Sequence, residues 1–281
     1  MKTIILTLAH FLGSIFNTGP TYNNSNNIRI VSVNGTISEI LVDLGLEKNI
    51  VGVDATSTYP KSLLKEKTKI GHRQNISIEG ILSLSPNVVL ALENELSQNA
   101  LQQLKNAKVK VMLFKQTFSV DNTKQLINDI AHSFNRDKEA KNIIAKLDND
   151  LSNAKKYIGN NKNIKILFIY ARGTGTLLVA GKNTQVDKMI TLAGATNAIN
   201  SFDNFKPLTP ESLISANPDV ILLFDSGLKS LGGELGLLKV QGIMQTKAGK
   251  NKKFIEMDGQ LLTGFGPRLG QAIQELAKHI N

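Results

Sequence analysis

One sequence pattern occurs twice in this chain, without gaps and 132 positions apart. The first copy is residues 77–90 (SIEGILSLSPNVVL) and the second is residues 209–222 (TPESLISANPDVIL). In each copy a Ser or Thr cap and a first-turn glutamate start a helix, and a proline ends it before an apolar strand. Two copies are too few for a solenoid. The repeat therefore predicts two similar α/β lobes in one chain.

Both halves of the chain also alternate strand patterns with helix patterns. In the first half, apolar runs predict strands, and 3.6-residue spacing predicts helices, at 28–33, 36–44, 50–53, 78–84, 88–92, 96–107 and 109–114. In the second half, the corresponding segments are 164–170, 185–192, 220–224, 254–257 and a last helix from 269. Such alternation is typical of parallel sheets covered by helices.

The middle of the chain has a different pattern. Residues 122–158 contain no strand pattern, and their apolar residues recur at helical spacing, which fits one long helix or two abutting helices. We therefore predict an α/β fold of two Rossmann-like lobes joined by a long α-helix, with a ligand cleft between the lobes. The expected parts are an N-terminal lobe at 28–118, a connecting helix at 119–160 and a C-terminal lobe at 161–281.

Composition narrows the possible functions. The chain of 281 residues has no cysteine, which excludes disulfides, thiolate metal sites and a lipid-anchored cysteine in this sequence. The net charge is +10, but the lysines are scattered and aromatic residues make up only 5%. No basic stripe with stacking aromatics is visible, so we expect no nucleic-acid partner, although a nucleic-acid binder stays a third option.

The first 27 residues resemble an export signal followed by a spacer. Lys2 precedes an apolar stretch that is too short to span a membrane, and a polar segment follows it. An ordinary apolar helix is the alternative. With no cysteine for a lipid anchor, we expect a periplasmic protein without stable membrane insertion.

Enzyme motifs are incomplete. Gly173 and Gly175 follow a predicted strand, but Leu178 stands where a dinucleotide-binding fingerprint requires its third glycine. There is no Walker motif, no nucleophile elbow and no pair of histidines at metal-ligand spacing. We therefore expect no catalysis and keep an α/β enzyme with an inter-lobe active site as the alternative from a different class.

Four segments together resemble the haem-binding proteins of bacterial haem ABC importers. They are VGVDATSTYP, KIGHRQNISIEGILSLSPNVVLA, LLVAGKNTQVDKMITLAGATNAI and MDGQLLTGFGPRLGQAI, and the likeness runs from Ile28 to the C-terminus. The resemblance implies a periplasmic binding protein: a monomer that binds haem as its transported ligand and delivers it to an ABC permease dimer. A siderophore or cobalamin carrier is the alternative within the same class.

The resemblance also implies the residues that contact haem. Tyr59 is the expected axial ligand, because ferric iron is a hard Lewis acid and phenolate is a hard anionic oxygen ligand. Lys61 places a cation near that oxygen. Arg73 is expected to pair with a propionate, and the neighbouring His72 is a possible second ligand or donor. Arg172 stands where some relatives have a histidine ligand, so we expect iron held by Tyr59 without a histidine opposite, and Arg172 on a propionate or above the porphyrin.

The repeated glutamates, Glu79 and Glu211, have two explanations. Each lies in the first turn of its predicted helix, where the positive end of the helix dipole stabilises a carboxylate. In related binding proteins for metal chelates, one acidic residue per lobe docks onto arginines of the permease dimer. The resemblance therefore implies a docking role, with which the helix-dipole explanation is compatible.

Overall fold

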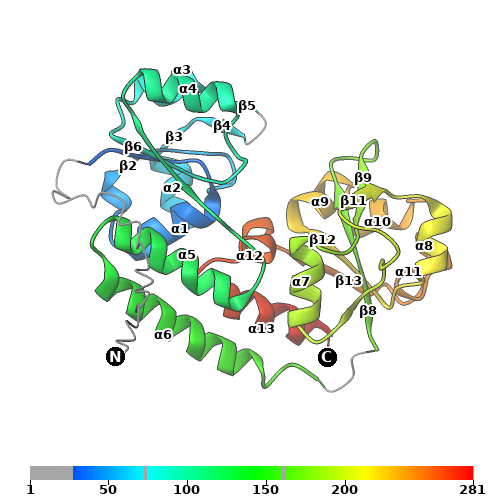
Figure 1. The fold of residues 1–281 in the computed structure, drawn as a ribbon. Helices are drawn as coiled ribbons and strands as arrows, with labels where there is room; N and C mark the ends of the chain where they lie inside the picture. The colour runs from blue at the N-terminus through cyan, green and yellow to red at the C-terminus, as the bar shows by residue number, and fades with distance from the viewer. Residues whose placement is uncertain (1–27, 73–74, 160–162, 281) are drawn as a thin grey trace, which may run out of the picture.

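The N-terminal half folds around a five-stranded, fully parallel sheet (Figure 1). The structure is a computed structural model that describes residues 28–72, 75–159 and 163–280. The expected export signal at 1–27 and the predicted contact Arg73 therefore lie outside the described residues. In sheet order the strands are β3 (Thr68–Lys69), β2 (Ile50–Val53), β1 (Ile30–Ser32), β6 (Val88–Leu92) and β7 (Lys110–Phe114).

Helices cover both faces of this sheet. The helices of this half are α1 (Gly35–Asp43), α2 (Lys61–Glu66), α3 (Ile78–Ser83) and α4 (Gln98–Asn106), with a 3-10 turn η2 (Glu47–Asn49) and a hairpin of β4 (Gly71–His72) and β5 (Asn75–Ile76). Along β6, Val88, Leu90 and Leu92 pack into the core on the side of α1, and Val89 and Ala91 pack on the side of α3 and α4. Burial on both faces explains why this strand is a continuous apolar run.

The connector consists of two helices, α5 (Val120–Ser133) and α6 (Asp137–Ala154). Between them the chain turns at Asn135, whose φ of 55° lies in the left-handed region, where asparagine is tolerated better than most residues. The sequence allowed one long helix or two abutting helices, and the structure has two. The last helix, α13 (Leu269–Ile280), packs along α6, and both run beneath the two lobes (Figure 1).

The C-terminal half contains a mixed sheet. In sheet order its strands are β11 (Phe205–Pro207), β9 (Leu177–Ala180), β8 (Lys165–Ala171), β12 (Val220–Phe224) and β13 (Phe254–Met257), and β10 (Thr196–Asn197) pairs with the start of β8. Strands β8, β12 and β13 are parallel, whereas β9 runs antiparallel to both β8 and β11. The sequence patterns did not predict β9, β10 or β11.

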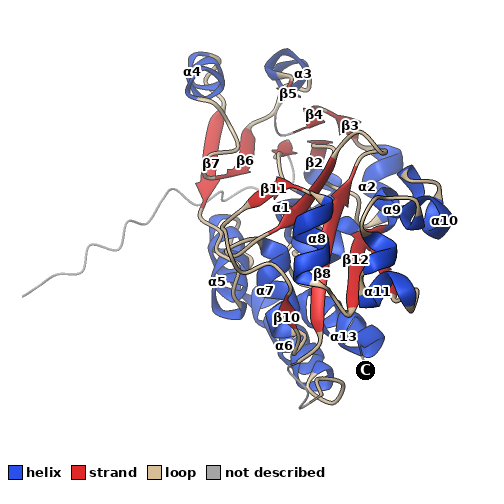
Figure 2. Cartoon of the chain, turned by 90° about the vertical axis from the view of Figure 1, so that its right-hand side faces the viewer, coloured by secondary structure: helices blue, strands red, loops and turns tan. Residues whose placement is uncertain are grey.

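Helices also flank this second sheet (Figure 2). They are α7 (Gln185–Leu192), α8 (Pro210–Ala216), α9 (Asp225–Ser230), α10 (Gly233–Leu238), η3 (Ile243–Gln245), α11 (Lys247–Lys250) and α12 (Gly259–Thr263). Along β12, Ile221 and Leu223 pack on the side of α8 and α9, while Leu222 faces α7, α12 and α13. One hydrophobic cluster runs from Leu90 in the first lobe to Leu222 in the second, so the two lobes share a core.

The sequence repeat occupies equivalent places in the two sheets. In the first lobe α3 leads into β6, which lies between β1 and β7; in the second, α8 leads into β12, which lies between β8 and β13. Ser77 caps α3 and Thr209 caps α8, as predicted. The prediction of two similar α/β lobes is therefore confirmed. Within the described parts of the chain, no helix has the length and apolarity needed to cross a membrane.

Candidate ligand-binding site

The Tyr59 loop begins at the carboxyl end of β2, which is the edge where open α/β sheets bind ligands. A buried carboxylate organises its base. Asp54 Oδ2 accepts hydrogen bonds from the backbone N and the Oγ1 of Thr56, at 3.0 and 2.6 Å, and its Oδ1 accepts one from Ser57 Oγ at 2.7 Å. Ser57 Oγ in turn lies 2.7 Å from Ser38 Oγ on α1. These hydrogen bonds explain why the DATS segment is polar, because they fix the loop to helix α1.

Tyr59 itself lies at the surface of this loop. The residue is 42% exposed, and its peptide bond to Pro60 is cis. Lys61 begins α2 directly afterwards and is exposed. The Nζ of Lys69 donates to the carbonyl of Leu63 at 2.9 Å and so ties α2 to β3. The structure therefore presents the phenol on a short loop that is anchored at both ends.

A cation that the sequence patterns did not assign to the site lies against this phenol. The guanidinium carbon of Arg268 is 3.6 Å from the centre of the Tyr59 ring. Arg268 also forms a bidentate ion pair with Glu39 on α1, with Nε–Oε1 at 3.0 Å and Nη2–Oε2 at 2.9 Å. The GFGPR segment had contributed only to the family resemblance. Glu39 gave no signal in the sequence, because helical spacing places it on the side of α1 opposite the apolar Ile37, Ile40 and Leu41, where a charged residue is usual.

Burial has the largest effect on the pKa of the carboxylate in this ion pair. The Glu39 side chain is 4% exposed and that of Arg268 is 15% exposed. Burial raises the pKa of Glu39 above its ordinary value of 4.5, and the hydrogen bond and charge of Arg268 offset part of this effect. Burial also raises the pKa of Asp43, one turn further along α1, with Lys146 and Arg268 opposing the shift. The site therefore has a desolvated carboxylate behind the guanidinium.

His72, another predicted contact of the first lobe, lies in the two-stranded β4–β5 hairpin, next to the base of the Tyr59 loop. His72 is exposed in the two-residue strand β4. The neighbouring Gly71 carbonyl accepts a hydrogen bond from Ala55 N at 2.8 Å, so the β4 hairpin and the Tyr59 loop are joined at their bases. Of the first-lobe haem contacts proposed from the sequence, this arrangement brings Tyr59, Lys61 and His72 to one edge of the sheet.

Arg172 belongs to the second lobe. It is exposed and follows β8 at its carboxyl end, where its backbone N donates to the Thr176 carbonyl at 3.1 Å. The next residue, Gly173, donates its N–H to Ser230 Oγ on α9 at 2.9 Å. Behind this turn the Tyr170 ring meets the Phe224 ring edge-on, with 6.0 Å between their centres. Arg172 is thus held on a turn that is tied to α9.

Glu79 and Glu211 are exposed in the first turns of α3 and α8. Ser77 Oγ accepts a hydrogen bond from Gly80 N at 2.9 Å, and Thr209 and Ser212 form a reciprocal capping box. Because the caps already bind the first backbone N–H groups, neither glutamate side chain is needed for capping. Both carboxylates are therefore available to a partner.

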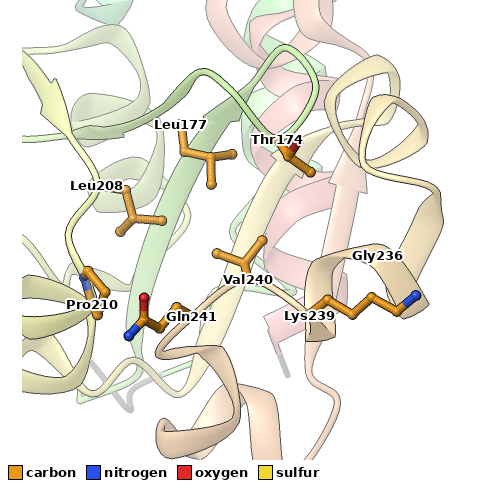
Figure 3. A pocket seen from close by; sticks show the side chains of 8 residues that line it. All are labelled: Thr174, Leu177, Leu208, Pro210, Gly236, Lys239, Val240 and Gln241. Carbon is orange, nitrogen blue, oxygen red and sulfur yellow. The ribbon is translucent and has the colours of Figure 1, made fainter.

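A cavity of about 290 Å³ lies in the second lobe, near the start of α8 (Figure 3). The aliphatic side chains of Leu177, Leu208 and Val240 form its interior, while the Lys239 side chain points away from it. Pro210, the residue before Glu211, contributes to its edge. The sequence patterns did not predict this cavity, since the strands and short helices that form it carry no strong periodicity.

Comparison with known proteins gives consistent results. The family model described as "Periplasmic binding protein" matches residues 30–261. The solved structure of the periplasmic haem-binding protein RhuT from Roseiflexus sp. RS-1, in apo form, is 38% identical with a TM-score of 0.86, over 90% of this chain and 97% of that one. The haem-binding protein BhuT, in complex with two haems, is 34% identical with a TM-score of 0.84 and the same coverage.

A curated relative extends the comparison to transport. The uncharacterised ABC transporter substrate-binding lipoprotein YvrC of Bacillus subtilis (strain 168) is 30% identical over 90% of this chain and 79% of its own length. Because YvrC is a lipoprotein, our expectation that no lipid anchor is present stays a prediction. Periplasmic binding proteins bind solutes and are not enzymes, so the alternative of an inter-lobe active site is not supported. The chain belongs to the periplasmic binding protein family, with the class III fold, and is a periplasmic or extracellular substrate-binding protein of an ABC importer.

Proposed function

We propose that this protein binds haem and delivers it to its ABC importer, with the phenolate of Tyr59 coordinating the ferric iron. The observation that carries the proposal is the exposed Tyr59 phenol, which stands at the carboxyl end of β2 on an anchored loop and under a guanidinium. The haem-binding relatives RhuT and BhuT support the same ligand class. A phenolate is a known axial ligand of haem iron.

The charges around this phenol suit the rest of the haem molecule. Haem carries two propionates, and we assign Lys61, Arg73 and Arg172 to them or to the phenolate oxygen, because cations stabilise anionic oxygens. Arg172 is a permanent cation and a poor iron ligand. His72 is assigned as a hydrogen-bond donor or second ligand beside the Tyr59 loop. Iron is then held from the first lobe, by Tyr59, without a histidine from the second.

Titration of the protein with hemin tests this proposal. We expect a saturable change of the Soret band, and its stoichiometry distinguishes one bound haem from a pair such as BhuT holds. Cobalamin and a ferric siderophore, added separately as competitors, test the alternative ligands. If hemin gives no saturable change while one of these competitors binds, the haem assignment is wrong and the chelate alternative replaces it.

Docking onto the permease gives a separate prediction. Replacing Glu79 or Glu211 by alanine is expected to weaken binding to the cognate importer by about fivefold each, because each loses an ion pair of about 1 kcal/mol with a permease arginine. Asp121→Ala is the matched control, since Asp121 is also an exposed first-turn acid, at the start of α5. Surface plasmon resonance against the importer in nanodiscs measures the effect. If the Glu79, Glu211 and Asp121 variants all bind the importer as tightly as the wild-type protein does, the docking role is excluded.

A further inference from the structure

The contact between Arg268 and Tyr59 differs from an ordinary surface cation–π pair, because the cation is fixed. The guanidinium lies 3.6 Å from the ring centre, while its Nε and Nη2, which form one of its edges, both donate to the carboxylate of Glu39. That carboxylate is almost fully buried on α1. A planar guanidinium held by two parallel hydrogen bonds has little freedom to turn. The ring of Tyr59 therefore stacks on a guanidinium whose position is fixed by the buried carboxylate of Glu39.

The backbone that carries Arg268 is fixed as well. The Gly264 carbonyl accepts hydrogen bonds from Thr36 Oγ1 at 2.6 Å and from Gln116 Nε2 at 2.9 Å, and the Phe265 carbonyl accepts one from Thr123 Oγ1 at 3.0 Å. Phe265 is buried with a φ of 49°, a conformation that a bulky residue keeps only when its surroundings enforce it. All three donors belong to the first lobe or to α5, whereas the acceptors follow α12 of the second.

We propose that Arg268 is a positioning residue for haem capture, which holds the Tyr59 ring so that its phenol oxygen faces the incoming iron. This inference rests on the proposed function, and it adds a residue and an ion pair to it. Two effects favour the bound state. A ring that is already oriented loses less conformational entropy when it coordinates. In addition, the attraction of a cation for an aromatic ring grows when the phenol oxygen becomes anionic, as it does on binding ferric iron.

The arrangement also connects haem binding to the relation between the lobes. Tyr59 and Glu39 belong to the first lobe, and Arg268 lies between α12 of the second lobe and α13 on the connector. The contact therefore joins the Tyr59 loop of the first lobe to a segment that follows the last short helix of the second.

Hemin titrations of three variants test the inference. Arg268→Gln is expected to bind hemin about 10-fold more weakly, which lies between the effects of an exposed and of a fully desolvated cation–π contact. Arg268→Lys, which keeps the charge and loses the planar fork, is expected to recover part of this loss. The double variant Glu39→Gln/Arg268→Gln removes both charges together, so it leaves no buried ion unpaired and is expected to fold and to match Arg268→Gln. Arg136→Gln, which breaks a partly exposed pair with Glu139 on α6, is the control.

Spectra separate positioning from mere support of the fold. The tyrosinate-to-iron charge-transfer bands are expected to shift or weaken in the Arg268 variants and to stay unchanged in Arg136→Gln. If wild-type protein binds hemin through Tyr59, and the Arg268 variants reproduce its Kd and its spectrum below their unfolding temperatures, the inference is wrong and the proposed function stands. If wild-type protein shows no hemin binding, the proposed function fails and the inference falls with it.

Discussion

Hemin is expected to bind the Tyr59→Phe variant at least about 100-fold more weakly than the wild-type protein. Phenylalanine keeps the ring under Arg268 and removes the single oxygen through which this side chain can coordinate iron. Losing an outer partner of a metal ligand already costs about 10–100-fold in affinity, so losing the ligand itself belongs at or beyond the upper end of that range. Absorbance titration in the Soret region measures the change.

The protein provides a matched control for this substitution. Tyr157, just beyond α6, is 40% exposed, and its ring also lies under a cation, with Lys278 Nζ 4.5 Å from the ring centre. Tyr157→Phe makes the same chemical change to a similarly exposed phenol, and we expect it to bind hemin like the wild type. If both variants keep the wild-type Kd and spectrum, Tyr59 is not the iron ligand.

The sequence predicted the parts of the fold whose burial is regular. Strand β6 is buried on both faces, so the run from Val88 to Leu92 is apolar without interruption. Each copy of the repeat contains its own cap and its own terminating proline, so both helix starts could be placed correctly. Agreement among capping, periodicity and chain-breaking residues is what makes such segments predictable.

Other elements depend on tertiary contacts that no local pattern records. Strand β11 is three residues long and exposed, and it pairs with β9 at the end of the sheet. Helices α9 to α12 have four to six residues each, which is too short for a helical period to stand out. These segments flank the second sheet (Figure 2) and contribute to the cavity near α8. Sequence periodicity therefore could not predict this part of the second lobe or the cavity.

Some residues of the candidate site could likewise be predicted from the sequence, and others could not. Tyr59 could be proposed because it belongs to a recognisable loop, and the bonds of Asp54 now explain why that loop has its polar residues. Arg268 could not, because its role depends on Glu39 and Tyr59, which are distant in the sequence and adjacent only in the fold. Arg73 lies outside the described residues, and its assignment to a propionate stays a prediction.

Loss of the buried ion pair between Glu39 and Arg268 is expected to have a large effect on the free energy of unfolding. Glu39→Ala is expected to lower the free energy of unfolding by about 3 kcal/mol at pH 7, because it leaves the guanidinium of Arg268 largely buried without a counterion. Urea denaturation, followed by circular dichroism, measures this change. Glu139→Ala is the control, because its pair with Arg136 at 3.1 Å is partly exposed on both sides, and such surface pairs contribute little.

The same carboxylate gives the stability a pH dependence of defined sign. Burial raises the pKa of Glu39 in the folded protein above its ordinary value of 4.5, so the folded state holds this proton more tightly than the unfolded chain does. The contribution of Glu39 to stability is therefore full below about pH 4.5 and declines as the pH rises through the folded pKa. Relative to Glu39→Gln, which cannot titrate, the wild-type free energy of unfolding is expected to fall between pH 4 and pH 7.

Two outcomes would contradict this account of the ion pair. A Glu39→Ala variant as stable as the wild type would mean that the Arg268 guanidinium reaches water without cost, although only 15% of its side chain is exposed. A wild-type stability that rises relative to Glu39→Gln over the same pH range would mean that Arg268 lowers the pKa of Glu39 more than burial raises it. In that case the pair would act as a strong stabilising bridge between the lobes, and separating them at this junction would require breaking it.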